Sequence, residues 1–123
     1  MTDKEKIQLL QAKPPSLGCL VDYYQNMLRS FGDLKRNYYD YMITEPLDCD
    51  EELKRIETAD YDLCCALLTM LFREDHFVQY GCFGRRCENG DVQKITNRMI
   101  LILEKEDKNY GLPKRSSIGR TTY

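Results

Sequence analysis

Hydrophobic and polar positions recur with helical periodicity along most of this chain. Over residues 17–30 the apolar side chains repeat at spacings of three and four, so they share one face of a predicted helix: Leu17, Leu20, Val21, Tyr24, Met27 and Leu28. A second stripe of this kind, over about 92–106, comprises Val92, Ile95, Met99, Ile102 and Leu103. Residues 59–73 are apolar nearly all round, which predicts a central helix that is buried on most sides.

Shorter elements lie between these helices. Thr2 and Glu5 form a capping-box pattern that begins a short amphipathic helix, and Pro14 with Pro15 stops it. A helix is predicted over about 34–43, although the density of tyrosine there also permits a strand. Two further short helices are predicted, one from Asp48 or Asp50 to about Glu57 and one between Val78 and Asn89.

Polar residues and glycines predict where these helices begin and end. Oxygen-bearing side chains precede four of them and are the expected N-caps: Ser16, Asp33, Thr58 and Asp91. Phe31-Gly32 is predicted to end one helix and Asn89-Gly90 another, because glycine adopts the left-handed conformation at low cost.

Together these elements predict an all-α fold, a single compact bundle of five to seven helices over residues 1–107. The length of 123 residues fits one domain. From residue 108 to 123 the periodicity is lost, and glycine, proline, serine and threonine accompany four basic and no acidic residues. This segment is predicted to be a flexible or extended basic tail.

Charge is distributed unevenly although the net charge is only −2, a value that predicts no general affinity for nucleic acid. From Asp40 to Asp62 there are nine acidic residues, against two basic ones, Lys54 and Arg55. An acidic middle of the chain therefore precedes a basic tail.

We expect a cytoplasmic protein without a membrane segment. No apolar stretch resembling a signal peptide follows Met1, and the longest apolar run, within 63–72, is too short to span a bilayer. The six cysteines are then expected to be reduced thiols.

The segment Arg73-Glu74-Asp75-His76-Phe77 is the first candidate site. In a functional interpretation, Asp75 orients the only histidine, His76, as a general base or metal ligand, with Arg73 and Glu88 nearby. In the structural alternative, which we favour, Arg73 and His76 bind the terminal carbonyls of the central helix and Phe77 plugs the core.

The cysteines give little support for a metal site or a catalytic thiol. Cys82 and Cys87 are separated by four residues rather than the two that zinc sites prefer, and Cys64-Cys65 are adjacent within an apolar helix. Common nucleotide, hydrolase and metal motifs are absent from the sequence. We therefore expect no metal and no cofactor.

Two surfaces of opposite charge remain as candidates for binding. A basic set is a candidate for contact with an anion or nucleic acid: Arg85, Arg86, Lys114, Arg115 and Arg120. An acidic and tyrosine-bearing set is a candidate for contact with a partner protein or a second copy of the chain: Tyr39, Tyr41, Asp48, Asp50, Glu51 and Glu52. The alternative for each set is an ordinary solvated surface.

Residues 63–103 carry a short pattern in which an apolar helix precedes an arginine, an acid, a histidine and a phenylalanine, followed by a glycine and a glutamate–glycine element. The matching residues are Leu67, Leu68, Arg73, Asp75, His76, Phe77, Gly81, Glu88, Gly90 and Val92. This pattern resembles a family of small, functionally uncharacterised bacterial and phage-encoded domains. The resemblance implies an all-α domain and suggests an accessory or counter-defence role, but no activity.

The leading hypothesis is a small non-enzymatic module that binds a partner protein through the acidic surface, as an inhibitor or regulator of a nucleic-acid-handling protein. A weak nucleic-acid binder that uses Arg85, Arg86 and the tail is the second hypothesis. An enzyme centred on His76 is the third.

Overall fold

A computed structural model describes residues 1–14 and 19–111 of the protein, with residues 107–111 described by their helical backbone alone. The described residues form six α-helices and two 3-10 helices and contain no β-strand, so the all-α prediction is confirmed. In chain order the elements are α1 (Asp3–Gln11), α2 (Leu20–Phe31), η1 (Tyr38–Tyr41), α3 (Cys49–Leu53), η2 (Ile56–Thr58), α4 (Tyr61–Phe77), α5 (Cys82–Glu88) and α6 (Asp91–Gly111).

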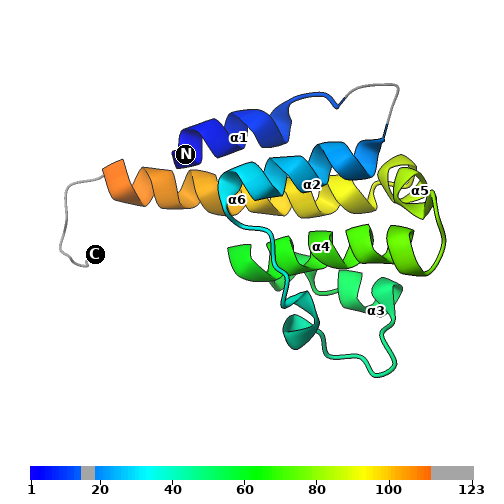
Figure 1. The fold of residues 1–123 in the computed structure, drawn as a ribbon. Helices are drawn as coiled ribbons and strands as arrows, with labels where there is room; N and C mark the ends of the chain where they lie inside the picture. Colours follow the sequence, from blue (N-terminus) through cyan, green and yellow to red (C-terminus); the bar gives the residue numbers. More distant parts are fainter. Residues whose placement is uncertain (15–18, 112–123) are drawn as a thin grey trace.

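Helix α4 lies at the centre of the bundle (Figure 1). Helices α2 and α6 pack along one side of it, and α3 and η1 cover the other. Helix α1 packs along α6 on the side away from α4, while the short α5 closes the end of the bundle where α4 turns back into α6. This arrangement explains why α4 is apolar nearly all round.

The core joins α4 to each of its neighbours. Nine consecutive residues of α4, from Cys64 to Phe72, are buried. The Phe83 ring of α5 lies 5.4 Å from the Phe72 ring of α4 and 5.8 Å from the Tyr24 ring of α2. Since burial of a large apolar side chain contributes about 1.5–3 kcal/mol, this aromatic cluster holds three helices together.

Several predicted helix ends are confirmed. The capping box of α1 is formed, with the Glu5 N–H donating to Thr2 Oγ1 at 3.1 Å and the Thr2 N–H donating to Glu5 Oε1 at 2.9 Å. Helix α5 ends before Asn89, and Gly90 adopts a positive φ of 93°. Asp48 caps α3 by accepting from the Glu51 N–H.

The central helix differs from the prediction at both ends. Its N-cap is Asp60, which accepts from the Leu63 N–H at 2.8 Å, rather than Thr58. It then continues past residue 73 to Phe77, because the charged residues after Phe72 are compatible with a helix that projects beyond the core. Asp75 and His76 are therefore helical.

The prediction of a helix over 34–43 is wrong except for the single 3-10 turn η1, and the strand alternative is also wrong. Asp33 does not cap a helix; its Oδ2 accepts from Lys6 Nζ at 3.0 Å and from the Tyr61 hydroxyl at 2.6 Å. A carboxylate used for these contacts with α1 and α4 is not available to begin a local helix.

The long helices near the two ends of the described chain also have shifted limits. Helix α2 begins at Leu20 with Cys19 as its N-cap, and Ser16 lies outside the described residues. Helix α6 includes Asp91 in its first turn rather than as a cap, and it continues five residues past the predicted end, to Gly111. None of the helices in the described part of the chain is both long and apolar enough to cross a membrane.

Candidate functional site

The residues of the first candidate site, which includes Asp75 and His76, do not come together at the end of α4. Asp75 is buried, and its Oδ2 accepts hydrogen bonds of 3.0 Å from the N–H groups of Gly81 and Phe83. These are the N-cap and second residue of α5, so Asp75 caps α5 from the neighbouring helix. Both contacts are with the backbone, and none is with His76.

His76 is exposed and forms no hydrogen bond or ion pair with the described residues; its ring meets that of Phe77 edge-on at 4.5 Å. The predicted pairing of Asp75 with His76 is therefore wrong. The structural alternative is also wrong, since within the described chain neither Arg73 nor His76 donates to a helix carbonyl. Glu88 is exposed at the far end of α5 and does not line the cleft that contains His76.

Arg86 lies at the centre of a network of carboxylates. Its Nε and one terminal nitrogen donate to the two oxygens of Glu74 at 3.0 and 2.7 Å. Its other terminal nitrogen donates to Asp50 Oδ1 at 2.7 Å and to Asp91 Oδ2 at 2.9 Å. One guanidinium thus connects α3, α4 and α6 to α5, in the bidentate geometry that favours arginine over lysine.

This pairing changes the titration of the groups around it. Burial raises the pKa of the Glu74 carboxyl, but the hydrogen bonds and charge of Arg86 lower it by more, so the pKa lies below its ordinary value. Burial, followed by the negative charge of Glu74, raises the pKa of the Cys49 thiol to about 12 and that of Cys82 to about 11. Neither thiol is an activated nucleophile.

The predicted basic surface is reduced by this network. Arg86 is 13% exposed and shares its donors among three carboxylates, so it is not available to bind phosphate as predicted. Arg85 is exposed. Lys114, Arg115 and Arg120 lie outside the described residues.

The prediction that Glu52 belongs to the acidic binding surface is also wrong. It is fully buried and accepts from the N–H groups of Ile43 and Thr44 at 2.9 and 2.7 Å, from the Thr44 hydroxyl, and from Arg55 at 2.7 Å. Burial raises the pKa of its carboxyl, but the hydrogen bonds from Thr44, Arg55 and Ile43 lower it by more, to below its ordinary value of 4.5. Glu52 is an internal anchor for the loop before α3 and cannot contact a partner.

The rest of the acidic and tyrosine-bearing set lies at the surface. Asp48, Asp50 and Glu51 are exposed, and Glu51 pairs with Lys54 at 2.6 Å. Tyr39 is exposed and donates to Glu45 at 3.3 Å, and the negative charge of Glu45 raises the pKa of its hydroxyl. Tyr41 is half-buried.

Apolar side chains lie unexpectedly beside these acids. Phe77 was predicted to plug the core, but it is 73% exposed, and Val78 is 78% exposed. Both line a groove of about 410 Å³ between α3 and the end of α4, together with Tyr38, Asp48 and Asp50. No pattern in the sequence indicates this exposure, because it depends on α4 extending beyond the core. We call this hollow the α3–α4 groove.

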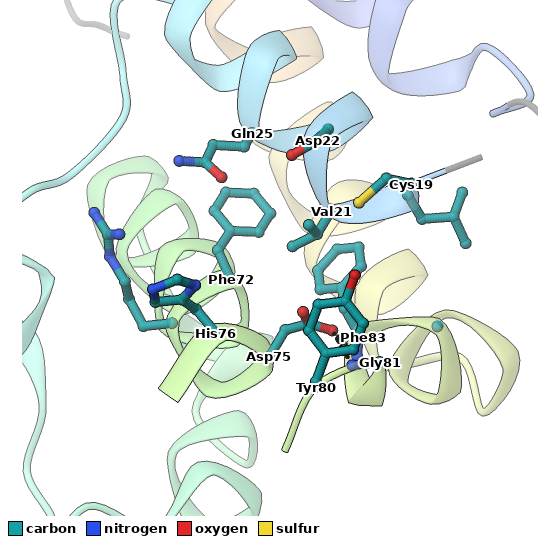
Figure 2. Close-up of a pocket in the computed structure, with 13 residues that line it drawn as sticks. Cys19, Val21, Asp22, Gln25, Phe72, Asp75, His76, Tyr80, Gly81 and Phe83 are labelled. Carbon is teal, nitrogen blue, oxygen red and sulfur yellow. Dashed lines mark hydrogen bonds between the residues drawn. The ribbon is translucent and has the colours of Figure 1, made fainter. Parts of the chain in front are cut away.

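A larger hollow, the α2–α4 cleft, lies on the other side of α4 (Figure 2). It has a volume of about 700 Å³, and its lining includes Asp22, Gln25, Phe72, Arg73, Asp75 and His76. Arg73 lines both the cleft and the α3–α4 groove. Across the described residues, no group of three or more histidine, cysteine or acidic side chains is arranged to hold a metal ion.

Comparison with known proteins gives no match: no family model fits the chain, and no curated protein or solved structure is similar to it. The resemblance seen over residues 63–103 therefore stays a prediction.

Proposed function

We propose that this protein is a small non-enzymatic binding module that docks a segment of a partner protein in the α3–α4 groove. The observation that carries the proposal is the pair of exposed apolar residues, Phe77 and Val78, beside the carboxylates of Asp48 and Asp50. Burial of exposed apolar surface supplies binding free energy, and charges at the rim supply specificity and speed of association.

The charge of the surroundings favours a basic segment. Asp48 and Asp50 line the groove itself, and of the nine acidic residues between Asp40 and Asp62 all except Glu52 have exposed side chains. Two arginines line the groove: Arg86 is neutralised by its own carboxylates, and Arg73 lies where the groove and the α2–α4 cleft meet, since it lines both. A lysine- or arginine-rich segment with an apolar anchor is therefore the complementary ligand.

Nucleic-acid-handling proteins are a class of partner that fits this chemistry, since they carry basic surfaces for phosphate. An inhibitor or regulator would cover such a surface with its own carboxylates. This form of the proposal explains why the acidic residues are concentrated in one segment of the chain.

The test is selection from a random peptide library displayed on phage, followed by affinity measurement with the enriched peptides. Enrichment of peptides that combine an apolar anchor with lysine or arginine is expected. Enrichment of acidic peptides, or none, would contradict the proposal.

Variants of the groove residues test whether the peptides bind in the α3–α4 groove. Asp48→Asn with Asp50→Asn removes two charges but keeps an N-cap for α3, because asparagine caps helices as well as aspartate. Phe77→Ser with Val78→Ser removes the apolar anchor. Both double variants should weaken peptide binding by about tenfold or more. The matched controls are Glu104→Gln with Glu106→Gln, and Leu101→Ser, which alter exposed residues of α6 and should leave affinity unchanged.

A further inference from the structure

The α2–α4 cleft contains polar side chains without partners in the described structure. Arg73 is half-buried and forms no ion pair or hydrogen bond there, and neither does His76 one turn later on the same face of α4. The carboxylates of the same turn do have partners: Glu74 pairs with Arg86, and Asp75 accepts from the N–H groups of Gly81 and Phe83. A half-buried guanidinium that is left unpaired in a hollow is available for an anion.

The facing wall carries the opposite charge. Asp22 and Gln25 lie three residues apart on α2, so they share one face of that helix, and both line the cleft. Neither forms a hydrogen bond or ion pair with another described residue. Asp75, the other carboxylate in the cleft, is already occupied by the N–H groups of Gly81 and Phe83. Asp22 is therefore the carboxylate that can receive a cation.

Between these two walls the surface is apolar. Phe72 and Val21 line the cleft, and Tyr80 contributes a ring at its edge (Figure 2). The volume of about 700 Å³ falls in the range of about 300–1,000 Å³ that holds small-molecule ligands in proteins.

We propose that the α2–α4 cleft binds a small zwitterion with an apolar side group, such as a free amino acid. Its carboxylate pairs with the guanidinium of Arg73, with the His76 imidazole as a second donor. Its ammonium pairs with Asp22, and its side group lies against Phe72. The three contacts use the three kinds of surface that the cleft offers.

Three related probes test the two charged contacts separately: L-phenylalanine, phenylalaninamide, which lacks the carboxylate, and N-acetylphenylalanine, which lacks the ammonium. His76 is the only histidine, so its imidazole NMR signals report on the cleft without ambiguity. Phenylalanine is expected to shift these signals in a saturable way below about 50 mM, a weak affinity typical of a ligand of this size. Each of the other two probes should bind about tenfold more weakly or worse.

Variants connect each probe to its residue. Arg73→Gln should abolish the preference for phenylalanine over phenylalaninamide, and Asp22→Asn the preference over N-acetylphenylalanine. The controls, Arg85→Gln and Asp40→Asn, change exposed charges outside the cleft and should leave both preferences intact. Circular dichroism of each variant verifies the fold.

Absence of a saturable shift with phenylalanine would overturn the proposal, as would equal binding of all three probes. The result is independent of peptide docking in the α3–α4 groove. Asp22 lines the cleft and not the groove, whereas Asp48 and Asp50 line the groove and not the cleft. The Asp48→Asn, Asp50→Asn variant should therefore bind phenylalanine as the unaltered protein does.

Discussion

Arg86 donates two parallel hydrogen bonds to Glu74, of 3.0 and 2.7 Å, and the two side chains are 13% and 14% exposed. A pair so little exposed to water cannot lose one member without leaving the other charge uncompensated. The same guanidinium also binds Asp50 of α3. The Arg86–Glu74 pair therefore helps to keep the acidic wall of the α3–α4 groove in place.

Arg86→Met should lower the free energy of unfolding by about 3 kcal/mol, because Glu74 would remain as an unpaired and largely buried carboxylate. The double variant Arg86→Met, Glu74→Met should recover part of this loss, since it removes both charges. Urea denaturation of the three proteins measures the effect. Arg85→Met, at an exposed site on the same helix, is the control and should change stability by less than about 0.5 kcal/mol.

Stability should depend on pH through Glu52 and Glu74. The pKa of each carboxyl is lower in the folded protein than its ordinary value of 4.5. Their contribution is therefore fully present above pH 4.5 and is lost as the pH falls through the folded pKa values. Urea midpoints measured from neutral pH downward should fall below about pH 4.5, and less steeply in Glu52→Gln. Identical pH profiles for the two proteins would contradict this assignment.

Asp75→Ala should lower the free energy of unfolding by about 2 kcal/mol, because the N–H groups of Gly81 and Phe83 would lose their common acceptor. Asp75→Asn keeps one acceptor oxygen and should recover much of that loss. Hydrogen exchange of the two amides by NMR localises the effect. Unchanged exchange at both amides in the alanine variant would show that the contact is unimportant.

Thiol labelling should single out one cysteine. Cys19 is exposed, whereas burial raises the pKa of Cys64 and Cys65 to about 12 and that of Cys87 to about 11. The native protein at neutral pH should therefore react rapidly with one equivalent of a thiol reagent such as DTNB. The fast phase should be absent in Cys19→Ser. More than one fast equivalent would show that a further thiol opens to solvent.

The sequence predicted the helical class well because periodicity reports which face of each helix is buried, and burial of those faces builds the core. The stripe of α6 and the all-round apolar surface of α4 are examples. The prediction of a helix failed over 34–43, where contacts with residues far away in the sequence determine the conformation of the chain. Asp33 binds Lys6 and Tyr61, and buried Glu52 holds Ile43 and Thr44, so no local pattern describes this segment.

The candidate sites were harder to predict, since composition does not distinguish a paired charge from a free one. Arg86 and Asp50 are 36 residues apart in the chain, and their contact exists only because α3 and α5 meet at α4. Glu52 resembles its neighbours Asp50 and Glu51 in sequence, yet it alone is buried. Phe77 was assigned to the core because apolar residues usually lie there, but the last turn of α4 projects beyond it.

Helix α1 has its most extensive packing against α6 rather than against its sequence neighbour α2. During translation α1 therefore leaves the ribosome well before its principal docking surface has been synthesised. Its own capping box can begin the helix, but a helix of nine residues is marginal in water without tertiary contacts. Completion of the bundle must then wait for α6, and a nascent chain arrested before Asp91 would expose the buried face of α4 to chaperones.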